Sequence, residues 1–165
     1  MALQDVNGDW TADSKVVFSR PLAGNNEQGG IVAYADDDNY VKLAWEMSDV
    51  NAPINKLRVV LLREQNGSAA TLQVTGSDAQ RIVGADGAIW LRLKKTGDTY
   101  RAYYSSNGSV YRFMGSTTLS AEPAQAGLVA FNRAGSSTDL DVAFDHFRIE
   151  SLGDPVPSGV ARLRP

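Results

Sequence analysis

The chain of 165 residues contains 43% hydrophobic and 21% charged residues, which suits one core of ordinary size and one domain rather than two. Its net charge of −3 comes from 19 acidic and 16 basic residues mixed along the chain, and no basic run could neutralise a phosphate backbone, so we expect no nucleic-acid partner. The absence of cysteine excludes disulfides, thiolate catalysis and cysteine-ligated metals.

The N-terminal sequence MALQDVNGDW has neither the basic start nor the apolar run of a signal peptide. No segment approaches the ~18 consecutive apolar residues that a membrane span requires. We therefore expect no membrane contact, and a secreted protein would have its signal outside this chain.

Alternation of apolar and polar residues with period two recurs along nearly the whole chain, as half-buried strands require. It predicts ten strands, at residues 10–19, 30–35, 40–47, 57–64, 70–74, 89–95, 99–105, 110–116, 127–132 and 140–150. No apolar pattern of helical period persists long enough for a stable helix. Short strands at this spacing predict an all-β sandwich or barrel.

The connections between these strands are typical of hairpins. Asn-Gly at 66–67 and at 107–108 supplies the positive φ values that tight turns need. Residues 153–165 hold three of the six prolines and show no alternation. The sequence thus predicts a β-sandwich domain over 1–152 and a Pro- and Gly-containing tail or linker over 153–165.

The acidic stretch DDDN, residues 36–39, has three interpretations: a hairpin turn, a calcium-binding loop or a pair of catalytic carboxylates. Asp and Asn favour turns because their side chains bond nearby backbone amides. An EF-hand loop needs glycine at its sixth position, which counted from Asp36 is Val41. We favour the turn. No acidic residue lies in a motif that fixes a partner carboxylate, so we predict no catalytic residue and no enzyme activity.

Three strands carry aromatic and basic side chains in the phase that faces away from the predicted core. These residues are Tyr40 and Lys42, Trp90 and Arg92, and Arg101 and Tyr103. Aromatic rings stack on sugar rings and guanidinium groups donate to paired hydroxyls, so the set predicts a carbohydrate-binding surface. Cross-strand aromatic and arginine pairs also stabilise sheets without binding a ligand, and this alternative stays open.

The opposite phase of the strands predicts a shared core. Its expected members are Val41, Leu43, Leu91, Leu93, Tyr100, Tyr104, Val129, Phe131, Phe144 and Phe147.

The lone histidine, His146, follows Asp145 in the last predicted strand. A Ser-His-Asp triad is not indicated, because neighbours on an extended strand point to opposite faces. Phe144 and Phe147 are three residues apart, which breaks period two. A β-bulge at Asp145-His146 would let both rings reach the core and would leave His146 on the surface.

The segments NNEQGGIVAYADDDNYVKLAWE, IWLRLKKTGDTYRAYYSSNGSVYRFMG, AGLVAFN and VAFDHFRIE together resemble the concanavalin A-like β-sandwich domains at the C-terminus of bacterial β-xylosidases and in related secreted polysaccharide-degrading proteins. The likeness covers about residues 8–150. Trp10 and Tyr111 depart from the family, which more often has Phe and Trp there. The resemblance implies a two-sheet antiparallel, jelly-roll-like (concanavalin A/laminin-G-like) sandwich.

The resemblance also implies a function. We expect a non-catalytic carbohydrate-binding module that is secreted, binds a polysaccharide or oligosaccharide and is attached to a catalytic domain. The alternative is a structural domain that supports a catalytic partner without binding free glycan. Related sandwiches use the acid of a final-strand F-D-x-F motif to hold a structural calcium ion, which implies Asp145 as a ligand with help from Asp9 or Asp5.

Overall fold

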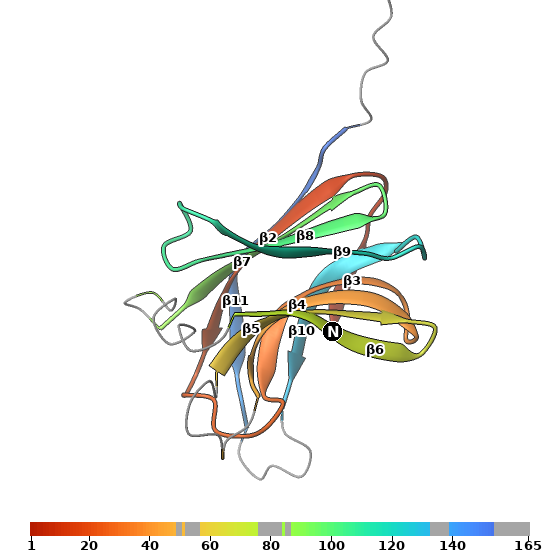
Figure 1. The fold of residues 1–165 in the computed structure, drawn as a ribbon. Coiled ribbons are helices and arrows are strands. Elements are labelled where there is room, and N and C mark those ends of the chain that lie inside the picture. The colour runs from red at the N-terminus through yellow and green to blue at the C-terminus, as the bar shows by residue number, and fades with distance from the viewer. Residues whose placement is uncertain (49–50, 52–56, 76–83, 85–86, 133–138, 154–165) are drawn as a thin grey trace, which may run out of the picture.

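The computed structural model describes residues 1–48, 51, 57–75, 84, 87–132 and 139–153, and this part of the chain forms eleven β-strands and no helix. The strands belong to two antiparallel sheets that lie face to face in Figure 1. The predicted all-β, jelly-roll-like sandwich is confirmed. In the described part of the chain, no helix is long and apolar enough to cross a bilayer.

Sheet A has six strands in the order β1-β10-β3-β4-β5-β6. Their bounds are Ala2–Asp5 (β1), Gln125–Phe131 (β10), Gln28–Asp36 (β3), Asn39–Met47 (β4), Leu57–Gln65 (β5) and Ser68–Thr75 (β6). Among the strands of the described residues, β1 alone was not predicted from the sequence, because four residues, ALQD, are too few to show alternation.

Sheet B has five strands in the order β11-β2-β7-β8-β9. Their bounds are Val142–Ser151 (β11), Trp10–Phe18 (β2), Ile89–Thr96 (β7), Thr99–Ser105 (β8) and Arg112–Thr118 (β9). In Figure 1 most of sheet B forms the upper layer and sheet A the lower one. All ten predicted strands are therefore present.

The core lies between the sheets and contains most of its predicted members. Five of them are fully buried: Val41, Leu43, Leu91, Leu93 and Tyr100. Three others are partly buried and pack against this cluster: Tyr104, Phe144 and Phe147.

The predicted phase of β10 is wrong. Val129 lies opposite Gly30 and Phe131 opposite Gln28 on the face turned away from the core, and Phe131 is 47% exposed. Ala126 faces the core instead. Both phases of QAGLVAF contain apolar residues, so alternation could not distinguish the core face from the outer face.

The predicted β-bulge in the last strand is confirmed. The register between β11 and β2 shifts between Asp145 and Arg148. His146 has a φ of 59° and is exposed, as expected for the extra residue of a bulge. Phe144 and Phe147 consequently both pack against the core.

The DDDN stretch is the hairpin turn between β3 and β4. The Asp36 carboxylate accepts hydrogen bonds from the Asp38 amide (2.9 Å) and from Asn39 Nδ2 (2.9 Å), and Asp37 accepts one from the Tyr34 hydroxyl (2.7 Å). These local bonds are what favours Asp and Asn in turns.

Residues 154–165 of the predicted tail lie outside the described residues. The division into a domain over 1–152 and a tail over 153–165 therefore stays a prediction, although the last strand ends at Ser151.

Candidate functional site

The six residues predicted to bind carbohydrate lie on two opposite faces of the sandwich. Those from β7 and β8 lie on the outer face of sheet B, where Arg92 is opposite Tyr103 and Trp90 is opposite Ser105. Tyr40 and Lys42, on β4, lie on the outer face of sheet A. The core separates the two groups, so they cannot form one surface.

On the outer face of sheet B, Arg92 is already bound within the protein. Its Nε donates to Asp13 Oδ1 (2.6 Å) and its Nη2 to Asp13 Oδ2 (3.2 Å). Its guanidinium carbon lies 3.9 Å from the centre of the Tyr111 ring. The hydrogen bonds with Asp13 raise the pKa of Arg92 further. Two of its five N–H donors and one face of its guanidinium are therefore engaged within the protein.

Trp90 is likewise covered by its neighbours. The centre of its ring lies 5.5 Å from that of His146 and 6.0 Å from Lys15 Nζ. A Cβ added at Gly108, which has a φ of +71°, would lie 2.7 Å from the indole. The ring therefore packs between a backbone turn and a histidine, which supports the sheet-stabilising interpretation for Trp90.

The outer face of sheet A contains buried residues although it faces away from the core. Val129, Gly30, Ala44 and Val60 lie in register across β10, β3, β4 and β5. All four are buried, and a Cβ on Gly30 would collide with the Leu43 carbonyl oxygen. These small and aliphatic residues form an apolar floor.

Polar side chains are buried beside this floor. Lys42 Nζ donates to Gln28 Oε1 (2.5 Å) and lies 5.8 Å from the centre of the Phe131 ring. Burial lowers the pKa of Lys42. Arg58 Nε donates to Glu46 Oε1 (2.7 Å), and Glu46 is 5% exposed. Burying charges is costly unless they are paired, so such a cluster outside the core is a candidate functional surface.

A pocket of about 330 Å³ lies on this face. Its lining residues are Met1, Val32, Tyr34, Asp37, Tyr40, Lys42, Val129 and Phe131. Burial, with a hydrogen bond to Glu64, raises the pKa of Tyr40 to about 12, so its hydroxyl keeps its proton. The volume and the mixture of aromatic walls with few polar groups are typical of small-molecule sites. We call this pocket, with Gln28, Glu46 and Arg58 beside it, the sheet A groove.

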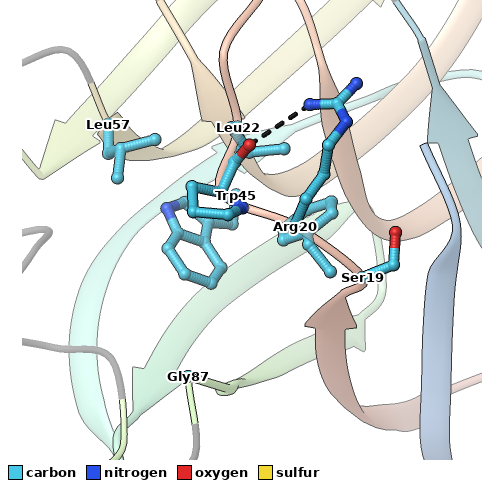
Figure 2. A pocket seen from close by; sticks show the side chains of 8 residues that line it. Ser19, Arg20, Leu22, Trp45, Leu57 and Gly87 are labelled. Carbon is cyan, nitrogen blue, oxygen red and sulfur yellow. Dashed lines mark hydrogen bonds between the residues drawn. The ribbon is translucent and has the colours of Figure 1, made fainter. Parts of the chain in front are cut away.

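Figure 2 shows a second pocket, of about 380 Å³, lined by Phe18, Ser19, Arg20, Pro21, Leu22, Trp45, Leu57 and Gly87. The polar group on its rim is already bound: Arg20 donates to both carboxylate oxygens of Glu27 (3.0 and 2.9 Å) and to the Pro21 carbonyl oxygen. The Arg20 hydrogen bonds, aided by the Ala23 amide, hold the pKa of Glu27 at about 2. An apolar pocket with occupied donors suits a sugar less well than the sheet A groove.

The predicted calcium ligands are not brought together. Asp145 lies opposite Lys15 in the register of β11 and β2, and Asp9 lies six residues further along the chain, roughly 20 Å away at ~3.3 Å per residue. Asp9 accepts a hydrogen bond from the Gly97 amide, and Asp5 accepts one from Gln125 on sheet A. Among the described residues no three His, Cys, Asp or Glu side chains cluster as metal ligands. Calcium binding by Asp145 stays a prediction.

Sequence reasoning missed most of the sheet A groove. Gln28 precedes the strand predicted from residue 30, and Phe131 was assigned to the core. Glu46 shares the phase of Tyr40 and Lys42, and this was the one available signal. Glu46 lies opposite Gln28 on β3 and opposite Arg58 on β5. These pairings depend on the order of the strands, which alternation along one strand does not reveal.

Comparison with known proteins agrees with this architecture. The GH43 protein BlXynB from Bacillus licheniformis matches with a TM-score of 0.68 and 23% identity over 87% of this chain and 27% of its own. A xylan β-1,4-xylosidase from Bacillus halodurans matches with a TM-score of 0.70 and 13% identity over 88% of this chain and 28% of its own. The carbohydrate-binding module CBM66 from Bacillus subtilis matches with a TM-score of 0.58 and 16% identity over 91% of this chain and 78% of its own.

These likenesses confirm the resemblance to the sandwich domains of xylosidases, and at such identities they show the fold alone. The chain spans about a quarter of the length of the two enzymes. A model of the family described as "Protein of unknown function (DUF1349)" matches residues 1–152. No curated protein matches the chain.

Proposed function

The chain belongs to the DUF1349 family, whose description assigns no role, and from its structure we propose that it is a non-catalytic carbohydrate-binding module whose ligand lies in the sheet A groove. The observation that carries this proposal is a pocket with aromatic walls beside buried, hydrogen-bonded polar side chains on an outer sheet face. Tyr34, Tyr40 and Phe131 supply apolar area for the C–H faces of sugar rings. Lys42 uses one of its three N–H donors on Gln28, and the others can donate to hydroxyl groups.

The carboxylates of the groove support binding rather than hydrolysis. Glycoside hydrolysis needs two carboxyl groups about 5 to 9.5 Å apart that are free to exchange protons or attack. Glu46 is paired with Arg58, and Asp37 accepts the hydroxyl of Tyr34. Both are therefore engaged as acceptors within the protein.

The context of the fold supports a role as an accessory domain. Similar sandwiches make up 27% of a longer GH43 protein and 28% of a longer xylan β-1,4-xylosidase. We propose that this chain acts outside the cell on a polysaccharide or oligosaccharide, next to an attached catalytic domain. The groove holds two acids, Asp37 and Glu46, and two bases, Lys42 and Arg58, and this balance of charge suits a neutral glycan.

The test is a screen of the whole chain against neutral polysaccharides by glycan array and affinity electrophoresis. Tyr34→Ala should weaken retention, because Tyr34 lines the groove. Tyr103→Ala is the matched control, since Tyr103 is also a half-buried tyrosine but lies on the outer face of sheet B. Loss of binding in Tyr103→Ala alone would move the site to sheet B.

A second candidate function is a structural domain that packs against a catalytic partner. The observation that favours it is again the likeness to longer proteins, in which a similar sandwich makes up about a quarter of the chain. This function predicts that no glycan retains the wild-type chain. Release of measurable hydrolysis products by the isolated chain would contradict both candidates.

A further inference from the structure

The outer face of sheet B differs in charge from the chain as a whole. On the side of the strands that carries Trp90 and Arg92, this face has five basic and three acidic side chains. The basic ones are Lys15, Arg92, Lys94, Arg101 and Arg148, and the acidic ones are Asp13, Asp145 and Glu150. The whole chain has a net charge of −3. This face is therefore a locally basic surface on an acidic protein.

Two of the basic residues form an unfavourable pair. Lys94 and Arg101 lie directly opposite each other on β7 and β8. Like charges in this position destabilise a sheet. Among the described residues no carboxylate lies within ion-pair distance of either one. Folding alone gives no reason for this pair.

The acids of the same face are engaged elsewhere. Asp13 accepts both hydrogen bonds of Arg92, and Glu150 pairs with Arg148. Asp145 lies opposite Lys15 in the register, and strands β2 and β7 separate its strand from that of Arg101. An anion that approaches Lys94 and Arg101 would thus meet two cations that no carboxylate of the described residues pairs with.

Aromatic rings lie next to the cationic pair. Tyr103 follows Arg101 by two residues on the same face and contacts Phe113 on β9, with ring centres 5.4 Å apart. Phe113 is 58% exposed. An exposed aromatic ring beside unpaired cations offers a ligand both an apolar platform and charge.

We propose that Lys94, Arg101, Tyr103 and Phe113 form a second binding surface, for an acidic polysaccharide. Uronate or sulfate groups of such a chain would accept hydrogen bonds from Lys94 and Arg101, and a neighbouring sugar ring would lie on Tyr103 and Phe113. This surface is separate from the sheet A groove, so the inference does not depend on the neutral glycan proposed there. A nucleic acid is disfavoured because two cations on a chain of net charge −3 give weak backbone neutralisation.

The experiment uses the whole chain and two forms of one backbone, polygalacturonate and its fully methyl-esterified form, which lacks the charges. Affinity electrophoresis should show retention by polygalacturonate only. Retention should weaken between about 50 mM and about 500 mM NaCl, because exposed charges are screened. Equal retention by the two forms would overturn the proposal, as would no retention by either.

Variants locate the binding. Lys94→Gln combined with Arg101→Gln should reduce polygalacturonate affinity by about fivefold or more. The matched control is Arg148→Gln, which removes a cation of the same face that is paired with Glu150 and should have little effect. Unchanged affinity in the double variant would overturn the assignment.

The double variant should also melt at the same or a higher temperature, because the like-charge contact is removed. A folded variant keeps the binding result interpretable.

Double-stranded DNA is the last competitor. If it displaces polygalacturonate at equal charge concentration, the surface is a general anion site and the polysaccharide proposal is wrong. Neutral glycan binding in the same samples reports separately on the sheet A groove.

Discussion

The outer faces of the two sheets contain similar residue types, yet the neighbours of those residues differ. On sheet B, two of the side chains that alternation places outward are covered by residues from a loop and a bulge: Arg92 stacks on Tyr111, and Trp90 packs against His146. On sheet A, the outward residues surround a pocket, and Lys42 extends over it to reach Gln28. Residue type and phase therefore identify an outer face, whereas the packing around each side chain determines what is left to bind a ligand.

The charged residues of the two faces also differ in burial. Lys42 and Glu46 on sheet A are 8% and 5% exposed, whereas Arg101 on sheet B is exposed. A buried charge interacts strongly with whatever approaches it because water screens it little. An exposed charge is screened by salt. Ligands on the two faces should consequently differ in their response to salt.

The largest expected effect is on stability at Trp90. Because Gly108 and His146 cover its indole, Trp90→Ala should lower the free energy of unfolding by about 2 kcal/mol. Urea denaturation measures the change. The control is Phe113→Ala on the same face, which should change it by less than about 0.5 kcal/mol, since Phe113 is largely exposed. A Trp90→Ala protein of normal stability that has lost neutral glycan binding would restore sheet B as the main site.

The next effect is on binding at Lys42. Lys42→Met keeps most of the side-chain volume and removes the donor, so affinity for a neutral glycan in the groove should fall about tenfold, or ~1.4 kcal/mol. Isothermal titration calorimetry measures it. Stability should be unchanged or higher, because the buried cation has no carboxylate partner within ion-pair distance among the described residues. Lys94→Met, on the other face, should leave neutral glycan affinity intact.

A smaller effect is expected at Phe131. Its ring borders the groove and is 47% exposed, so Phe131→Ala should cost about 1 kcal/mol of glycan binding and less than about 0.5 kcal/mol of stability. Calorimetry and thermal melting give the two values. A large loss of stability with unchanged binding would mean that Phe131 packs as a core residue, as the sequence had suggested.

The smallest effect concerns calcium at Asp145. If the resemblance extends to a metal site, calcium should raise the melting temperature slightly and EDTA should lower it, because an ion bound only by the folded state stabilises that state. Asp145→Ala should remove this response. Equal melting temperatures with calcium and with EDTA would leave Asp145 as the carboxylate of a bulge opposite Lys15.

The sequence was informative where one residue pattern had one structural solution. Period-two alternation predicted ten of the strands, and Asn-Gly predicted two turns, which lie at positive φ for Asn66, Gly67 and Gly108. The spacing of Phe144 and Phe147 predicted the bulge, because only an extra residue lets both rings face the core. These are local constraints, set by the backbone and by neighbours along the chain.

The tertiary structure decided which outward residues share a surface. Tyr40 and Trp90 have the same phase relative to the core, but β4 and β7 belong to different sheets, so their outer faces point in opposite directions. The tertiary structure also decided which face of β10 packs on the core, since both faces of this strand carry apolar residues. The observed orientation places Phe131 beside Lys42. Alternation specifies core and outer face for one strand at a time; strand order and register, set by packing between distant segments, determine which side chains meet.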